Sequence, residues 1–163
     1  MSAHGRHVWY ELMTNAPEAA KTFYGDVVGW TTQEMPMPGG TYTLLMAGET
    51  ATAGLMEQPE EMRRMGVPPS WRGFVAAEDV DAAAAKVTRL GGQVHVPPTD
   101  VPGVGRFAIV ADPQGAAFAL FKASSPGPEQ TPEPGTPGHI GWHELYAQDW
   151  EKAFAFYAEL FGW

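Results

Sequence analysis

The chain has 163 residues, with 19 acidic and 10 basic side chains and a formal net charge of −9. That length suits about one globular domain, and the negative charge disfavours nucleic acid and anionic membranes as partners, because both attract basic proteins. The absence of cysteine excludes disulfides and thiolate chemistry. Because we find no secretory leader pattern and no apolar run long enough to cross a bilayer, we expect a cytoplasmic protein that binds neither nucleic acid nor membrane.

The first 58 residues predict the element order strand–helix–strand–strand–strand, or βαβββ. Residues 7–13 favour a strand, and a helix follows in which Asn15 can cap the N-terminus and Pro17 suits the first turn. The helix is expected to end at Gly29. Its apolar stripe falls at spacings of three and four: Ala20, Phe23, Tyr24 and Val27. Three strands are then expected, at residues 30–35, 42–46 and 52–57.

The same order returns in residues 71–122, after a Pro-containing connector at residues 59–70. Asp79 can cap the helix of this second half, and the pair Gly91-Gly92 can end it. Its four strands are expected at residues 71–77, 93–96, 106–111 and 116–122. The sequence therefore predicts one domain, residues 1–122, built from two βαβββ modules at residues 1–58 and 71–122.

Residues 123–137 form a Pro- and Gly-rich linker, and residues 138–163 then repeat residues 5–30 without a gap. The two stretches share ten of 26 positions, so that Trp142 matches Trp9 and Glu144 matches Glu11. We interpret residues 138–163 as the first strand and helix of a further module, the start of a second such domain. An isolated strand and helix cannot bury their apolar faces. The stretch therefore belongs to a longer four-module protein, docks on its own domain, or is exchanged with another chain; we favour the first of these.

Several motifs in this order resemble the vicinal oxygen chelate superfamily, which includes glyoxalase I, extradiol dioxygenases and the bleomycin and fosfomycin resistance proteins. The motifs are FYxxxxGW, DVDAAAAKVTRLGG and ADPQGAAFALF, and the resemblance covers residues 5–122 and again 138–163. It implies an α+β fold, in which paired βαβββ modules form a cupped eight-stranded mixed sheet with helices outside and a small-molecule pocket inside. In the enzymes of this superfamily, a divalent metal in the pocket binds two neighbouring oxygens of the substrate and acts as a Lewis acid.

The metal-ligand positions that the resemblance implies fall on Trp9, Arg72 and Ala119, and on residues 55–57, where only Glu57 could bind a metal. Tryptophan, arginine and alanine side chains do not ligate divalent metals. We therefore expect the standard metal site to be lost and no cofactor to be bound. A divalent metal at a relocated site formed by His7, Glu11 and Glu57 is the weaker alternative.

Glu11 shares a strand face with Trp9 and is expected to point into the pocket. A buried carboxylate needs a partner, and Arg72, at the matching place in the second module, can supply it. Such a pair could be an internal tie, a polar anchor for a ligand, or, if Glu11 has a raised pKa, a catalytic general base. The expected ligand-binding residues are Trp9, Glu11, Tyr42, Arg72, Phe107 and Phe121.

Three functions follow from this reading. We favour a protein similar to the glyoxalase and bleomycin-resistance group that binds a small organic molecule in a concave pocket without a metal. The alternative is a metal-dependent lyase or dioxygenase with a relocated metal site. The third is an interaction protein with a vestigial pocket. A homodimer, or strand exchange through residues 138–163, is a further possibility for its partners.

Overall fold

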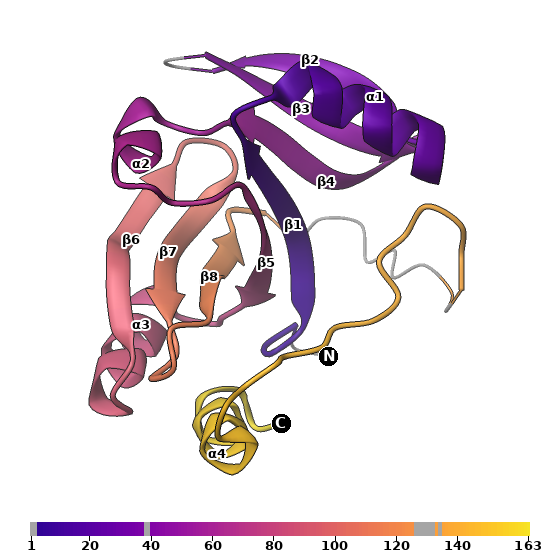
Figure 1. Ribbon diagram of the computed structural model, residues 1–163. Coiled ribbons are helices and arrows are strands. Elements are labelled where there is room, and N and C mark those ends of the chain that lie inside the picture. Colours follow the sequence, from indigo (N-terminus) through magenta and orange to yellow (C-terminus); the bar gives the residue numbers. More distant parts are fainter. Residues whose placement is uncertain (1–2, 38–39, 126–132, 134) are drawn as a thin grey trace. The chain divides into compact units, whose positions relative to one another are not determined.

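The computed structural model describes residues 3–37, 40–125, 133 and 135–163 (Figure 1). The chain divides into two compact units. Unit 1 comprises Met1–Val8, Gly73–Gln130 and Glu144–Trp163, and unit 2 comprises Trp9–Arg72 and Thr131–His143. None of the helices in the described residues is long and apolar enough to span a membrane.

The element order βαβββ occurs twice, as expected. The first set is β1 (His7–Thr14), α1 (Pro17–Val28), β2 (Thr31–Met37), β3 (Gly40–Ala47) and β4 (Thr50–Glu57), and it is followed by the short helix α2 (Glu60–Arg64). The second set is β5 (Ser70–Ala76), α3 (Val80–Arg89), β6 (Gln93–Val101), β7 (Gly105–Ala111) and β8 (Ala117–Ala123). A last helix, α4, spans Trp150–Phe161.

The strands form one mixed sheet in the order β2-β3-β4-β1-β5-β8-β7-β6. Within each module the first strand pairs in parallel with the last one, β1 with β4 and β5 with β8. The remaining pairs inside the modules, β2 with β3, β3 with β4, β6 with β7 and β7 with β8, are antiparallel. The α+β fold with an eight-stranded mixed sheet is therefore confirmed.

The core of unit 2 lies on one face of its strands. Leu12 of β1 is buried together with Leu45 of β3 and Leu55 of β4, and Tyr24 of α1 packs against them. Because neighbouring residues of a strand point to opposite faces, this burial of Leu12 places Glu11 on the other face. The alternation expected for β1 is thus correct.

The ends of α1 agree only in part with the sequence. Gly29 ends the helix in the left-handed conformation, with φ +79°, which favours glycine. Asn15 does not cap the N-terminus, contrary to expectation. The N-cap residue is Ala16, which makes no side-chain capping bond, and its N–H donates instead to Thr14 Oγ1 at 3.1 Å. The helix begins at Pro17, which makes Ala16 the N-cap residue, whereas an Asn15 cap would require the helix to begin one residue earlier.

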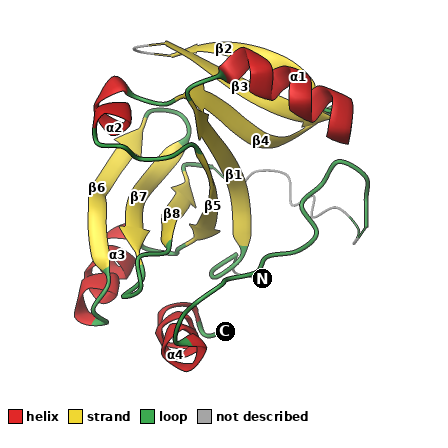
Figure 2. Cartoon of the chain, in the orientation of Figure 1, coloured by secondary structure: helices red, strands yellow, loops and turns green. Residues whose placement is uncertain are grey.

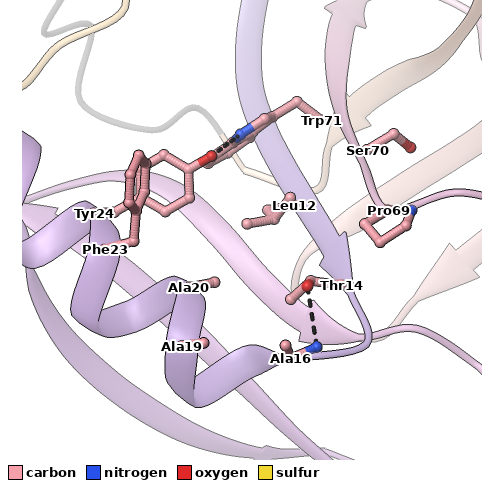
Figure 3. Close-up of a pocket in the computed structure, with 10 residues that line it drawn as sticks. All are labelled: Leu12, Thr14, Ala16, Ala19, Ala20, Phe23, Tyr24, Pro69, Ser70 and Trp71. Carbon is pink, nitrogen blue, oxygen red and sulfur yellow. Dashed lines mark hydrogen bonds between the residues drawn. The ribbon is translucent and has the colours of Figure 1, made fainter.

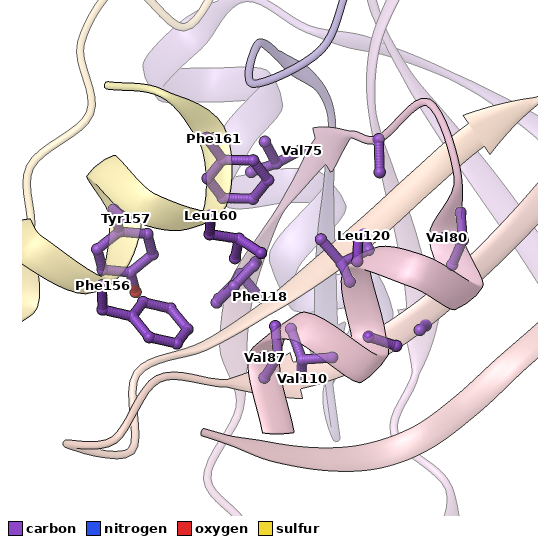
Figure 4. Packing of buried hydrophobic residues seen from close by; sticks show 14 residues of the cluster. Val75, Val80, Val87, Val110, Phe118, Leu120, Phe156, Tyr157, Leu160 and Phe161 are labelled. Carbon is purple, nitrogen blue, oxygen red and sulfur yellow. The ribbon is translucent and has the colours of Figure 1, made fainter. Parts of the chain in front are cut away.

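Unit 1 has the larger apolar core, and α4 is part of it (Figure 4). Helix α3 begins as expected at Asp79, whose carboxylate accepts a hydrogen bond from the Ala82 N–H at 2.9 Å. Val87 of α3 and Phe118 of β8 are buried in one cluster with Phe156 and Leu160 of α4. Packing against α3 and β8 thus buries the apolar side of α4.

The strand expected at the start of residues 138–163 is not formed. Residues 139–147 lie outside any strand, and Figure 2 draws them as loop leading into α4. A strand requires hydrogen bonds to a neighbouring strand, and none of the strands in the described residues pairs with this segment. The expected helix needs no such neighbour, because its hydrogen bonds are internal, and it is present as α4.

Candidate functional site

The carboxylate of Glu11 lies at the end of a chain of hydrogen bonds in unit 2. Glu11 is only 9% exposed. The indole N–H of Trp9 donates to the hydroxyl of Tyr42 at 2.8 Å, and this hydroxyl donates to Glu11 Oε2 at 3.2 Å. Trp9 and Glu11 of β1 are therefore both hydrogen-bonded to the hydroxyl of Tyr42, which belongs to β3.

Gly54 of β4 makes this contact possible. Glu11 is paired with Gly54 across β1 and β4, whereas Tyr42 is paired with Met56 across β3 and β4. The phenol of Tyr42 must cross β4 to reach Glu11, and a Cβ at Gly54 would lie 1.8 Å from its hydroxyl oxygen. Gly54 was not predicted as a site residue from the sequence, although a glycine inside a strand is a known signal of close approach.

Burial raises the pKa of the Glu11 carboxyl, while the positive charge of Arg72 and the hydrogen bond from Tyr42 act in the opposite direction. Burial, followed by the neighbouring Glu11 charge, also raises the pKa of Tyr42. The phenol therefore keeps its proton at neutral pH and remains a donor to Glu11.

Arg72 interacts with Glu11 through long-range electrostatic attraction and not through a direct contact. Burial lowers the pKa of the Arg72 guanidinium, and the Glu11 charge opposes this shift. In the described part of the chain, no hydrogen bond or contact ion pair joins Arg72 to Glu11. The two side chains interact electrostatically but do not form the direct ion pair that the sequence suggested as an internal tie.

The structure brings four of the six expected ligand-binding residues together: Trp9, Glu11, Tyr42 and Arg72. The other two, Phe107 and Phe121, belong to unit 1. They are opposite each other across β7 and β8, and the ring of Phe121 packs edge-on against Phe74, with centroids 6.1 Å apart. Within unit 1, Phe121 therefore contacts Phe74, and Phe107 lies beside Phe121 on the neighbouring strand.

The side chains do not fit the divalent metal that the resemblance implies. Glu57 is paired with Thr14, so strand alternation places it on the face opposite Glu11, and it binds Arg63 at 2.7 Å. His7 lies in unit 1, where its ring stacks on that of Trp163 with centroids 5.9 Å apart. Among the residues that the structure describes, no group of three or more His, Cys, Asp or Glu side chains could hold a metal ion.

An open pocket of about 400 Å³ lies on the other face of β1, beside α1 (Figure 3). It is lined by Leu12 and Thr14 of β1, by Phe23 and Tyr24 of α1 and by Trp71, among others. The indole N–H of Trp71 donates to the Tyr24 hydroxyl at 2.7 Å, so two of the lining side chains are joined by a hydrogen bond. This pocket was not predicted from the sequence, in which Phe23 and Tyr24 were recognised only as part of the apolar stripe of the helix.

The chain is similar to one protein superfamily and to several named proteins. The model of the Glyoxalase/Bleomycin resistance protein/Dioxygenase superfamily matches residues 6–120. CFP32 of Mycobacterium tuberculosis (strain CDC 1551 / Oshkosh), which is named as a glyoxylase, is 44% identical over 127 residues, covering 77% of this chain and 46% of CFP32. DauV of Streptomyces sp. (strain C5), named as an anthracycline biosynthesis protein, is 34% identical over 172 residues, covering 98% of this chain and 62% of DauV.

The Mn(II)-bound glyoxalase from Novosphingobium aromaticivorans has a similar structure, with a TM-score of 0.63 and 21% identity. The match covers 98% of this chain and 52% of that one. At this identity the likeness shows a shared fold and leaves the chemistry of the site to the residues present. The chain spans about half the length of the curated relatives it matches.

Proposed function

Because the chain belongs to the Glyoxalase/Bleomycin resistance protein/Dioxygenase superfamily, we propose that it binds a small organic molecule at Glu11 and Arg72 and that its standard metal site is lost. The observation that carries this proposal is the arrangement of the two charges. Glu11 and Arg72 attract each other electrostatically but make no direct contact in the described part of the chain. A ligand that bridges them recovers interactions which the free protein lacks.

The chemistry of the site selects the class of ligand. Ionised Glu11 only accepts hydrogen bonds, and Arg72 only donates them. The matching molecule has a hydroxyl group that donates to Glu11, and beside it a carbonyl or similar oxygen that accepts from Arg72. The indole of Trp9 offers a flat apolar surface for the body of such a molecule, as is usual in small-molecule sites.

Proton transfer by Glu11 is the second candidate function. Burial raises the pKa of Glu11 towards the range of an effective general base. A bound hydroxy-carbonyl compound would place an acidic proton near this carboxylate. The name of CFP32 refers to a glyoxylase, which agrees with chemistry on organic carbonyl compounds. A metal-dependent lyase or dioxygenase reaction gains no support from the donor groups.

Calorimetric titration of the protein with aromatic hydroxy-carbonyl compounds tests the proposal. We expect binding that weakens at least tenfold in Glu11→Gln and in Arg72→Gln, because each variant loses one charge-assisted hydrogen bond, worth about 1.5–3 kcal/mol. Glu49→Gln is the matched control, since Glu49 is exposed at the turn between β3 and β4. Equal binding by all three variants would overturn the assignment of the site.

Metal analysis of protein purified without chelators tests the lost metal site. The expected result is less than stoichiometric Ni, Zn, Fe or Mn, unchanged in Glu11→Gln. Stoichiometric metal that disappears in this variant would contradict the proposal and favour a relocated site containing Glu11.

A further inference from the structure

A row of methionines crosses the sheet of unit 2 beside Glu11. Met13 of β1 is paired with Met56 of β4. Met56 is paired in turn with Tyr42 of β3, and Tyr42 with Met35 of β2. Because alternate residues of a strand share a face, Met13 lies on the same face as Glu11, and its partners across the sheet lie there too. We call these four residues the methionine row.

The side chains of the methionine row are accessible from outside the sheet. The core of unit 2 occupies the opposite face, where the leucines of β1, β3 and β4 are buried. Met13, Tyr42 and Met56 are only half-buried, and Met35 is 46% exposed. A molecule bound at Glu11 can therefore extend over the thioethers of this row.

The length of the row exceeds that of a single ring. The strands lie side by side in the order β2-β3-β4-β1 (Figure 1). Adjacent strands are about 4.8 Å apart, so the row extends about 14 Å from β1 to β2. A hydroxyl and a carbonyl that bind Glu11 and Arg72 occupy one end of it. A ligand with one ring leaves Met35, at the other end, without a contact.

The groups along this surface are uncharged. The neighbouring row begins at Glu11 and continues through Gly54 to Leu44 and Gln33, so its charge is confined to the end at β1. Methionine side chains adapt to the shape of a neighbour, and their sulfur atoms make favourable contacts with aromatic rings. This surface therefore favours a body that is flat, aromatic and neutral.

We propose that the molecule bound by Glu11 and Arg72 has a body of several fused aromatic rings, which lies over the methionine row. This inference rests on the proposed function and adds the size of the ligand to it. The two charges recognise the neighbouring hydroxyl and carbonyl groups, whereas Met35 selects ligands that reach β2.

Equilibrium dialysis with two probes tests the inference. Both have a hydroxyl beside a carbonyl, but 2′-hydroxyacetophenone has a single ring and 1-hydroxyanthraquinone has fused rings. We expect Met35→Ala to weaken binding of 1-hydroxyanthraquinone about fivefold, through loss of the sulfur contact, and to leave binding of 2′-hydroxyacetophenone unchanged. Met65→Ala is the matched control, because Met65 is 72% exposed at the end of α2, and it should change neither.

The Glu11→Gln variant separates this inference from the proposed function, since it should weaken both probes. If it weakens neither, the proposed function is wrong, and this inference falls with it. If Glu11→Gln acts as expected but Met35→Ala weakens both probes equally, or neither, only the size of the ligand is wrong. Failure of both probes to bind the unmodified protein would overturn both.

Nuclear magnetic resonance of methionine methyl groups gives a test in the unmodified chain. The methyl carbons are labelled with carbon-13, and the signals of Met35 and Met65 are assigned from their disappearance in the two alanine variants. An aromatic ring lying over a methyl group shifts its signal. We expect 1-hydroxyanthraquinone to shift the Met35 signal, 2′-hydroxyacetophenone to leave it in place, and neither to move that of Met65. A Met35 signal that responds to both probes, or to neither, would refute the inference.

Discussion

The phenol of Tyr42 crosses β4 at Gly54 on its way to Glu11, so a missing side chain determines whether this hydrogen bond forms. We predict that Gly54→Ala lowers the free energy of unfolding by about 1–3 kcal/mol, the usual cost of overpacking, and weakens ligand binding because Tyr42 is displaced. Chemical denaturation and titration of the variant measure both effects. Gly25→Ala is the control. Gly25 lies in α1, where a Cβ would meet only the Trp30 carbonyl oxygen at 3.5 Å, an ordinary contact. Alanine favours a helix by about 1 kcal/mol over glycine, so a similar loss of stability in Gly25→Ala would contradict the prediction.

Glu11 should also make stability depend on pH. Its pKa is raised in the folded protein, so the folded state holds the proton more tightly than the unfolded state does. This contribution is fully present below the ordinary carboxyl pKa and is lost as pH rises through the raised value. We therefore predict that Glu11→Gln gains stability relative to the unmodified chain as the pH rises above the ordinary carboxyl pKa. Urea denaturation at several pH values checks this, and an unchanged difference would show that Arg72 and Tyr42 cancel the effect of burial.

At the scale of elements, the N-termini of α1 and α3 should respond differently to removal of the residue expected to cap them. Asp79 caps α3 through the Ala82 N–H, whereas Asn15 caps nothing in α1. Asp79→Ala should lower the free energy of unfolding by about 1 kcal/mol, and Asn15→Ala should leave it nearly unchanged. Thermal or urea denaturation of both variants measures the difference. A loss in Asn15→Ala as large as that in Asp79→Ala would revive the cap expected from the sequence.

Local patterns predicted most of the fold because the information they carry is local. The helix α1, the cap at Asp79 and the alternation along β1 need only neighbouring residues, and the structure confirms them. The strand expected within residues 139–147 failed because a strand depends on a partner elsewhere in the chain. The contact of Tyr42 with Glu11 depends on the register of three strands. The sequence therefore indicated the residues of the site but not Gly54, on which their arrangement depends.

At the scale of the whole molecule, the tryptophan at the end of each repeat forms a hydrogen bond to the glycine at the start of the other repeat. Trp163 closes α4 and donates its indole N–H to the Gly5 carbonyl at 2.9 Å, within unit 1. Trp30, its counterpart after α1, donates to the Gly138 carbonyl at 2.7 Å, within unit 2. Each unit thus contains one hydrogen bond of this kind, which joins the last residue of one repeat to the first residue of the other.

If the units open independently, as separate cooperative units of a protein can, the two bonds should be separable by experiment. We predict that Trp163→Phe costs about 1 kcal/mol, the net value of one hydrogen bond, and speeds amide hydrogen exchange in α4 but not in β2–β4. Trp30→Phe should speed exchange in unit 2 and leave α4 unchanged. Trp150→Phe is the control, because Trp150 is largely exposed on α4. Faster exchange throughout the chain in either tryptophan variant would mean that the two units unfold together, and that the repeats stabilise one cooperative structure.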